Sequence, residues 1–489
     1  MTPCPETRPP LANLQHSRWF LASVFILAFC LRCLWSALSY HPPFRDPKQS
    51  MCRRYVESSC LLALGLGYSH TYAGSLARAA FESEVLRPML QGTPPDWTAG
   101  ERIPKDGLHP ETLHPPGVSL LTAGLWRLTG VNAFYCLQAF TSLFDASGVI
   151  LIFWLSAAIM PSHPVVARRA AILYAIFPPL LAACASRDST SIGFMPVATM
   201  LAVWLYYQYL SRGAVIWFLL SAFTTGLSAY FRSDALLLTA FLCLVHSGEV
   251  LKAFSIRNLI VYLMRPVVAL TIALFTLLPW AIHNDRTIGK LMFTSTAAGC
   301  TLVTGLGAYP NPWNFGPSDE DRHREAQEAG LRDAFGPEAD EFFRARFFSA
   351  VKSHPKAYLL TVARRFLMPL APPHDWNLLL RSDLSWSEIR SKGINPLKLL
   401  PYLLSSYWPQ LMSSAVGLIG LCGMVLALIQ LRFEQRALVV LALPYFYVTL
   451  SHVFTHMAPY YLLPAVFCQL IGFSYVVTVV LCRVKRFFL

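Results

Sequence analysis

Charged residues are scarce in this sequence. Asp, Glu, Lys and Arg make up 14% of its 489 residues, whereas 55% are hydrophobic, and the mean hydropathy is +0.45. Soluble domains carry about 25% charged residues, so this composition excludes an ordinary soluble enzyme and indicates a protein that spans a membrane several times. The net charge of +13 does not indicate nucleic-acid binding, because the basic residues are distributed among short segments between apolar runs.

Other features are missing as well. The hydrophilic loops contain no N-x-S/T acceptor for N-glycosylation, which favours a bacterial envelope over an ER lumen. The two halves of the chain do not mirror each other and no repeat is visible, which argues against an inverted-repeat transporter. The twelve cysteines lie mostly inside apolar runs and lack the paired spacing of a zinc site. Cys52, Cys60 and Cys300 fall in loops and are candidates for a disulfide.

Ten apolar runs are long enough to cross a bilayer, for which a helix needs roughly 17–25 residues. The first run lacks a small-residue cleavage site and is longer than the apolar part of a signal peptide, so we expect it to be retained. The sequence therefore predicts an all-α integral membrane protein with about ten transmembrane helices. The runs are 18–39, 133–160, 168–186, 191–210, 214–231, 235–251, 266–282, 401–431, 437–452 and 460–482.

The short connections between these runs predict the orientation. If the N-terminus is cytoplasmic, every inner connection is basic, as the positive-inside rule requires. Two long loops, 40–132 and 283–400, then lie on the outer side and hold most of the carboxylates. We expect three parts: a transmembrane module at 1–282 that includes the first loop, the second loop at 283–400, and C-terminal helices at 401–489. The inner basic residues are Arg168, Arg169, Arg212, Lys252, Arg257, Arg265, Arg432, Arg436, Arg483, Lys485 and Arg486.

The first outer loop carries the most specific pattern. Residues 55–69 read Tyr-x-x-x-Ser-x-x-x-Ala followed by Gly-x-Gly-Tyr-Ser, which predicts a short helix with small residues on one face, ended by the glycines. Residues 114–117 read His-Pro-Pro-Gly, a stiff approach to the apolar run 118–129. That run is too short to span, so we expect it to lie at the membrane interface or to re-enter it.

These segments resemble the GT-C superfamily of glycosyltransferases, which use polyprenyl-phosphate sugars and include protein O-mannosyltransferases and the aminoarabinose transferases of lipid A. Residues 226–238 are similar to the family's Gly-Leu-x-x-x-x-Arg-Pro-x-x-Leu-Leu stretch, 279–284 to Pro-Trp-x-x-Arg-Asn, and 460–464 to a late Arg-Tyr-x-x-Pro element. The resemblance covers about residues 17–300 and returns near 455–465. Where the family often carries an Asp-Glu pair before the tyrosine, this chain has Met-Cys-Arg-Arg.

The resemblance implies that an outer-loop carboxylate deprotonates the acceptor, which then displaces polyprenyl phosphate from the sugar. It implies an Asp soon after the first helix, which points to Asp46, with Glu57 as the alternative base. Asp46 is otherwise a turn residue paired with Arg45. Asp188 resembles a second acid of the family that positions donor or acceptor, and it also suits a helix N-cap. The three acids are able to bind Mg²⁺ or Mn²⁺, although their spacing does not demand a metal.

A donor phosphate requires cations at the level of the lipid headgroups. The candidates are Arg53, Arg54, Arg232 and His283; Arg232 matches the family position, with Asp234 or lipid headgroups as its alternative partner. Arg53 and Arg54 are equally consistent with a solvated face. Arg32 lies within the first apolar run and is either functional, as intramembrane charges commonly are, or extends to the headgroups.

The second outer loop predicts two amphipathic helices. One begins at Pro337 and places Phe343, Phe347 and Val351 on one face; the other, at 356–369, is basic. They either lie on the outer leaflet as a lid over the lipid donor or serve only for packing.

Taken together, the sequence predicts an inverting glycosyltransferase of GT-C type in a bacterial inner membrane, with its active site on the periplasmic side. Its partners would be a polyprenyl-phosphate sugar, a lipid, glycan or protein acceptor, and membrane lipids, with no nucleic acid. A multi-pass transporter or lipid-linked-sugar flippase is the main alternative, although transporters place ionisable residues near the membrane midplane. A non-catalytic membrane subunit is a further alternative.

Overall fold

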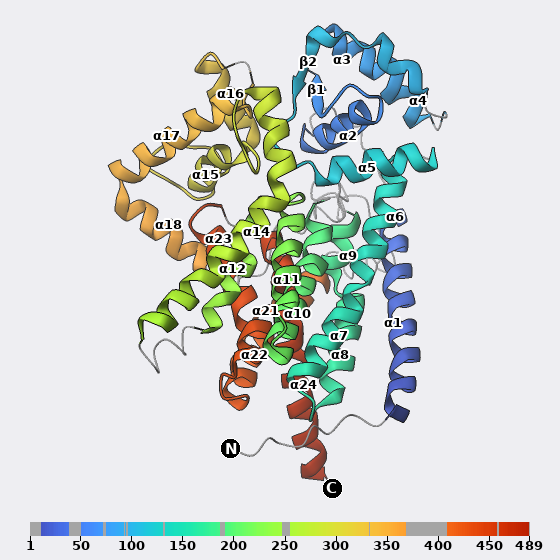
Figure 1. The fold of residues 1–489 in the computed structure, drawn as a ribbon, viewed down its shortest axis with the longest axis vertical. Coiled ribbons are helices and arrows are strands. Elements are labelled where there is room, and N and C mark those ends of the chain that lie inside the picture. The colour runs from blue at the N-terminus through green and yellow to red at the C-terminus, as the bar shows by residue number, and fades with distance from the viewer. Residues whose placement is uncertain are drawn as a thin grey trace, which may run out of the picture.

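The computed structural model describes residues 11–38, 50–71, 75–91, 93, 96–130, 133–185, 191–246, 255–331, 333–367, 408–456 and 459–488. These residues are almost entirely helical and form a bundle of long apolar helices beneath two smaller lobes (Figure 1). The short strands β1 (Ser69–Thr71) and β2 (Leu108–Pro110) pair antiparallel within the first lobe. The prediction of an all-α membrane protein is therefore confirmed for the described residues.

The bundle is assembled from both ends of the chain. Its N-terminal half comprises α1 (Leu11–Leu38), α6 (Ala133–Ala146), α7 (Gly148–Ile159), α8 (Pro164–Ile176), α9 (Pro178–Ala185), η4 (Ile192–Phe194), α10 (Met195–Arg212), α11 (Val215–Ala229), η5 (Ser233–Ala235), α12 (Leu238–Leu242), η6 (Cys243–His246) and α14 (Ile256–Ile288). Its C-terminal half comprises α21 (Trp408–Gln430), α22 (Gln435–Ala437), η9 (Leu438–Ala442), α23 (Leu443–Val453), η10 (Pro459–Ala465) and α24 (Val466–Phe488).

Five described helices are long and apolar enough to cross a membrane, which is fewer than the ten predicted runs. These are Arg18–Ser36, Leu137–Ile159, Ile256–Ile288, Gln435–Val453 and Tyr461–Lys485. Shorter apolar helices cover Val215–Ala229, Ser233–His246, Ala297–Gly307 and Ala415–Gln430. The count of ten stays a prediction.

Prolines explain one of the interruptions. The predicted run 168–186 is divided into α8 and α9 at Phe177, whose backbone is extended (φ −68°, ψ 113°). Pro178 disfavours a helical conformation in the residue before it and has no N–H to donate, so the helix cannot continue through this point.

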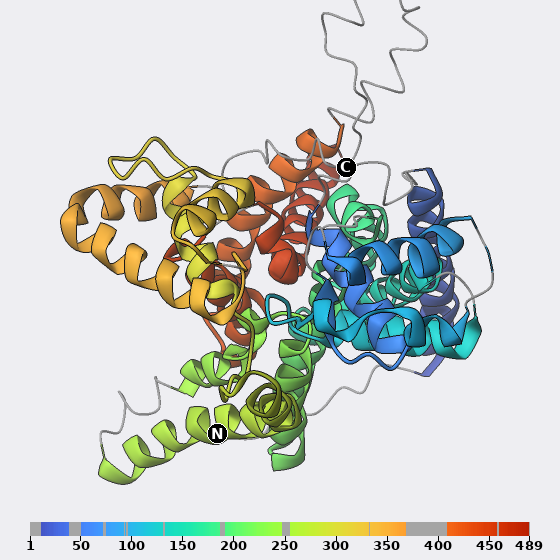
Figure 2. The same cartoon turned by 90° about the horizontal axis from the view of Figure 1, so that it is seen from above.

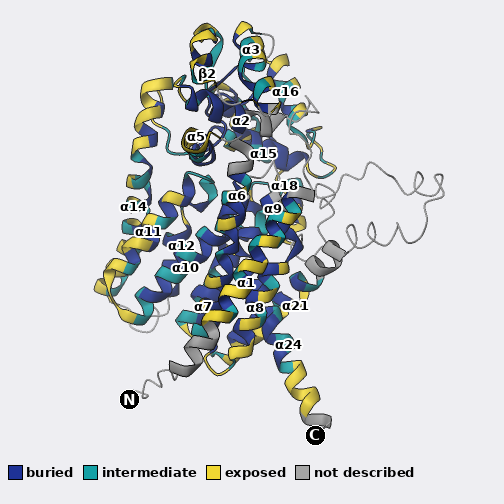
Figure 3. Ribbon diagram, turned by 90° about the vertical axis from the view of Figure 1, so that its right-hand side faces the viewer, coloured by how far each residue is buried: buried dark blue, intermediate teal, exposed yellow. Residues whose placement is uncertain are grey.

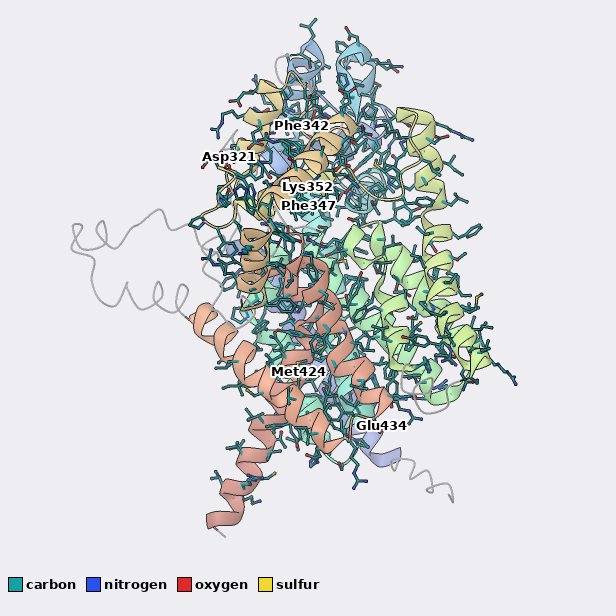
Figure 4. The ribbon with its side chains drawn as sticks, turned by 90° about the vertical axis from the view of Figure 1, so that its left-hand side faces the viewer. Asp321, Phe342, Phe347, Lys352, Met424 and Glu434 are labelled. Atoms are coloured by element: carbon teal, nitrogen blue, oxygen red, sulfur yellow. The ribbon has the colours of Figure 1, made fainter. Side chains whose placement is uncertain are left out.

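Both lobes lie at the same end of the bundle. In Figures 1 and 3, α1 begins and α24 ends at the opposite end. Figure 4 shows Glu434, in the turn between α21 and α22, far from the labelled Asp321, Phe342 and Phe347 of the second lobe. The predicted inner connections and the predicted outer loops are thus separated by the bundle.

Helix α14 shows how the bundle surface suits lipid. Only 11% of its most apolar stretch is buried, and Figure 3 shows exposed residues along much of its length. Because the exposed residues include Ile260, Leu263, Val267 and Phe275, this face would be costly in water and favourable against hydrocarbon chains.

The C-terminal helices pack through glycine. A Cβ added to Gly423 on α21 would lie 2.0 Å from the carbonyl oxygen of Gly472 on α24, and one added to Gly420 would lie 2.4 Å from that of Gln469. Small residues allow helix backbones to approach this closely, which is a common means of helix association in membranes.

The first lobe contains α2 (Ser50–Ala63), α3 (Leu76–Phe81), η1 (Glu82–Leu86), α4 (Arg87–Leu90), η2 (Trp97–Arg102), η3 (Lys105–Gly107) and α5 (Gly117–Thr129). Its core is formed by Cys60, Leu61, Phe81 and Trp126, among others. Gly65 and Gly67 adopt positive φ angles of 81° and 78° directly after α2, where the sequence predicted its end. Helix α5, with 13 residues, lies across the bundle axis (Figures 1 and 3).

The second lobe contains α15 (Ala297–Gly307), α16 (Asp319–Glu328), α17 (Pro337–Ser353) and α18 (Pro355–Leu367). Phe343 and Phe347 of α17 are buried in its core together with residues of α15. Of the two roles left open for this helix, the described packing therefore supports the structural one. Figure 2 shows the two lobes side by side above the bundle, and Thr296 donates its backbone N–H to the Thr112 carbonyl across their junction, at 2.8 Å.

The intramembrane Arg32 belongs to a closed polar cluster. Its Nε donates to Asp145 at 2.5 Å, and its remaining nitrogens donate to the carbonyls of Ala28, Ala175 and Tyr174. Asp145 also accepts the Tyr174 hydroxyl at 2.8 Å. Because both charges are fully buried and hydrogen-bonded, the pair joins α1, α6 and α8, and Arg32 does not extend to the headgroups.

Replacing Arg32 with Met should lower the free energy of unfolding by about 3–5 kcal/mol, because Asp145 would be left as a buried charge without its cation. The measurement is the melting temperature of the detergent-solubilised protein. Arg102→Met is the matched control, since Arg102 forms solvent-exposed pairs, which contribute little to stability. The double variant Arg32→Met/Asp145→Leu should recover most of the loss; equal instability of the single and double variants would contradict this account.

Candidate functional site

The predicted site residues fall into three groups. Asp46 and Asp188 lie outside the described residues, as do the side chains of Arg53 and Arg54 on α2. Glu57 lies in the first lobe, whereas Arg232 and His283 lie in or beside the bundle, on the segment after α11 and on α14.

Glu57 is an internal link of the first lobe. Its side chain is buried, and its Oε2 pairs with Arg78 of α3 at 2.5 Å. Its Oε1 accepts the backbone N–H of Thr71 at 2.6 Å and the Thr71 hydroxyl. Glu57 therefore fastens β1 and α3 to α2, and to reach an acceptor proton it would first have to leave Arg78 and Thr71.

His283 and Arg232 have different surroundings. The His283 ring stacks on Trp280 of the same helix at 5.1 Å and is exposed. Arg232 pairs with Asp234 at 2.9 Å and lies over the Tyr461 ring, 4.9 Å from its centroid. Asp234 was the alternative partner considered for Arg232, and the structure contains that pair.

The stretches that carry the family resemblance contact one another. The Tyr55 ring lies on the His114 ring, with centroids 4.1 Å apart, and the Tyr68 hydroxyl donates to the His114 carbonyl at 3.1 Å. Tyr68 also meets Trp280 edge-on at 5.3 Å. The segment 55–69, the Pro-Pro-Gly turn and the Pro-Trp stretch of α14 thus form one network.

The same network continues into the bundle. Gly117 donates its N–H to the Tyr230 carbonyl at 2.7 Å, and a Cβ at position 117 would lie 2.5 Å from that oxygen. The neighbouring Arg232 then contacts Tyr461. Five stretches that are far apart in the sequence therefore meet at the junction of lobe and bundle.

A cluster of acids and histidines lies where the two lobes meet. His70 Nδ1 is 3.5 Å from Glu111 Oε2, and His70 Nε2 is 3.8 Å from Asp333 Oδ2. Glu111 Oε1 accepts the backbone N–H of Leu113 at 2.8 Å and lies 3.6 Å from His114 Nδ1. The cluster joins β1, the segment after β2 and the second lobe, and it combines carboxylates with groups that can carry a proton.

Glu111, His70 and Asp333 were not predicted as site residues from the sequence. A signal for Glu111 was present, because it lies three residues before His114 in the stretch Glu-Thr-Leu-His-Pro-Pro-Gly. For Asp333 there was none, since its contact with His70 joins residues more than 260 positions apart.

A second cluster lies beneath the second lobe. His452 Nε2 is 2.8 Å from Asp234 Oδ2, and the His452 ring stacks on Tyr461 at 4.4 Å. Asp234 is thus placed between Arg232 and His452, and it orients both. His456 lies edge-on to Tyr461 at 5.6 Å. This cluster combines an arginine, two histidines and one carboxylate, whereas the one at the lobe junction is rich in carboxylates.

The candidate disulfide is not formed between the described cysteines: Cys60 and Cys300 are free and buried. The described residues also contain no group of three or more His, Cys, Asp or Glu that could hold a metal ion. Of the three acids considered for a divalent cation, only Glu57 is among them, and it is engaged with Arg78 and Thr71.

Comparison of the chain with models of known protein families and with curated protein sequences finds no match.

His456 should make the stability of the protein depend on pH. Burial and the nearby charges of Arg365 and His452 lower its pKa to about 4 from 6.5. Between these values the unfolded chain binds a proton that the folded protein does not, so stability is retained above pH 6.5 and falls as the pH is lowered towards 4. A difference of this size corresponds to about 3 kcal/mol.

Melting temperatures of the purified protein between pH 7.5 and 4 test this. His456→Gln should reduce the decrease between pH 6.5 and 4, while His354→Gln, at an exposed histidine of the second lobe, should leave it unchanged. An identical pH profile for His456→Gln and the unmodified protein would exclude His456 as the titrating group.

Proposed function

We propose that the protein is a membrane glycosyltransferase that moves a sugar from a polyprenyl-phosphate donor to an acceptor, with inversion, on the outer face of a bacterial inner membrane. The observation that supports this most directly is the meeting of the five stretches at the junction of lobe and bundle. Residues 55–69, 114–117, 226–238, 279–284 and 460–464 were singled out separately in the sequence, and their contacts join them into one site.

The position of this site suits a lipid-linked donor. It lies between a bundle with apolar helices and two hydrophilic lobes (Figure 1). A polyprenyl chain requires an apolar environment, while its phosphate and sugar require polar partners. At this level of the molecule a donor could keep its chain in the membrane and present its anomeric carbon to the lobes.

The reaction we propose is a single displacement. A carboxylate removes the proton from the acceptor nucleophile, whose electron pair forms the new bond to the anomeric carbon. The bond from that carbon to the phosphate oxygen breaks, and polyprenyl phosphate leaves with the bonding pair. Attack opposite to the leaving group inverts the anomeric centre, and cations stabilise the charge that develops on the phosphate.

Asp46 remains our first candidate for the base, on the family position. Glu111 is a second candidate because it lies in the carboxylate–histidine cluster between the lobes. Glu57 is the weakest of the three, since both of its oxygens are engaged by Arg78 and Thr71.

Release of polyprenyl phosphate by the purified protein, supplied with a panel of polyprenyl-phosphate sugars and membrane acceptors, tests the proposal. We expect Asp46→Asn to lower the rate by at least about 100-fold, the usual contribution of a general base, without a change in melting temperature. Glu57→Gln should instead lower the melting temperature. Glu84→Gln, at an exposed pair, is the control and should change neither.

Loss of release in Glu111→Gln with full activity in Asp46→Asn would move the base to Glu111 and keep the function. Full activity in all three carboxylate variants would contradict base catalysis by these residues. If the folded protein releases no polyprenyl phosphate from any donor but moves the lipid-linked sugar between leaflets of a vesicle, it is the flippase of the alternative hypothesis.

A further inference from the structure

Helix α18 buries one of its three basic residues while it exposes apolar side chains. Its exposed positions include the apolar residues Leu359, Leu360 and Phe366, whereas Arg365 is 1% exposed. An apolar outer face suits contact with lipid at the membrane surface. A buried guanidinium on the opposite face then points into the protein, toward α23.

Arg365 has fewer partners than its burial requires. Its NH1 donates to the Val453 carbonyl at 2.9 Å, while Nε and NH2 have no hydrogen-bond partner in the described structure. No carboxylate of the described residues lies within ion-pair distance of it. Burial lowers the pKa of this guanidinium, yet an arginine stays charged in proteins. Such a cation costs several kcal/mol unless an anion compensates it.

A second buried donor lies beside it. His456 Nδ1 also has no hydrogen-bond partner in the described structure, and the Arg365 charge is one of the causes that lower its pKa. Gly305 of α15 allows this region to pack closely, because a Cβ there would lie 2.9 Å from Arg365 NH2 and 2.0 Å from the Thr455 carbonyl oxygen. Backbone and glycine thus hold Arg365 next to the 453–456 segment.

The charges nearby do not balance. His452 and Arg232 share Asp234, so that carboxylate is engaged, and no carboxylate of the described residues pairs with Arg365. The charged guanidinium, with two nitrogens that have no partner among the described residues, and the imidazole of His456 on the facing segment form a site for an anion with several acceptor oxygens. A phosphate monoester fits this description, because its oxygens accept the fork of an arginine and a further N–H together.

We infer that Arg365 and His456 bind the phosphate group of a lipid phosphate. The lipid part of this inference rests on the proposed function, while the phosphate part rests on the contacts of Arg365 and His456. Arg232 remains paired with Asp234 and lines the same region through Tyr461.

The test measures binding of three probes to the full-length protein in detergent: polyprenyl phosphate, the uncharged polyprenol and inorganic phosphate. Arg365→Met should weaken binding of polyprenyl phosphate by at least about 10-fold, which is roughly the worth of one charge-assisted hydrogen-bond pair. Arg364→Met is the matched control. Arg364 is the neighbour of Arg365 on α18, but it is exposed and lies over the Tyr309 ring. Unchanged binding in Arg365→Met would overturn the inference.

Stability separates this role from a structural one. Without ligand, Arg365→Met should melt at the same temperature as the unmodified protein or higher, because it removes an uncompensated buried charge. If Arg365→Met instead melts at a much lower temperature, while the fraction that stays folded binds polyprenyl phosphate as tightly as the unmodified protein, Arg365 has a packing role. That result would overturn the inference.

The measurements with polyprenol and inorganic phosphate distinguish a lipid phosphate from a free phosphate as the ligand. Weak binding of polyprenol and of inorganic phosphate, with tight binding of polyprenyl phosphate, supports a lipid phosphate. Equal binding of inorganic phosphate and polyprenyl phosphate, both lost in Arg365→Met, would keep the phosphate site and overturn the lipid assignment. Binding that depends on Arg365 in a protein that transfers no sugar would support the site while contradicting the transferase proposal.

Discussion

The close approach of Gly117 to Tyr230 holds the first lobe on the bundle. Its N–H donates to the Tyr230 carbonyl at 2.7 Å, and any larger side chain at this position would collide with that oxygen. The two prolines before it fix the direction from which the chain arrives. Because the same turn carries His114, which contacts Tyr55 and Tyr68, the position of this one backbone contact determines how the outer motifs meet the membrane helices.

Burial then decides what each charge can do. Arg32 pairs with Asp145 and donates hydrogen bonds to neighbouring backbone carbonyls. The pair therefore stabilises the bundle, and its hydrogen-bonding groups are already used within the protein. Glu57 and Arg78 also pair inside the first lobe. Arg365 is equally buried, but no carboxylate of the described residues pairs with it. A buried arginine therefore has a structural role at position 32 and is a candidate for ligand binding at position 365. The difference lies in the partners of the two guanidinium groups.

Local features of the fold could be predicted because they depend on neighbouring residues. The end of α2 follows from Gly65 and Gly67, which take the positive φ angles that glycine permits. The start of α17 follows from Pro337 in its first turn, and the short α5 follows from the length of an apolar run. The number of spans was less predictable, because hydropathy averages over breaks such as the one at Phe177 that interrupt a helix without changing its composition.

The candidate site could be predicted only in part, because its contacts join distant segments. The motif pattern indicated residues 55–69 and 114–117, yet not that Tyr68 would meet Trp280. The pairing of Arg232 with Asp234 is local and was foreseen as an alternative. The approach of Asp333 to His70, and the burial of Arg365 against the 453–456 segment, arise from tertiary packing that no local spacing encodes.

The two clusters near the lobes differ in charge, and this asymmetry would suit the displacement reaction proposed above. Glu111 and Asp333 gather around His70 between the lobes, whereas Arg365 and His456 lie beneath the second lobe with one carboxylate, Asp234, shared by other cations. An acceptor nucleophile requires a carboxylate that takes up its proton, while a leaving phosphate requires cations. If both kinds of group were mixed in one cluster, they would neutralise each other as Glu57 and Arg78 do. Under the proposed function, their separation would assign the carboxylates to the acceptor on the side of the lobes and the cationic group to the lipid phosphate on the side of the membrane.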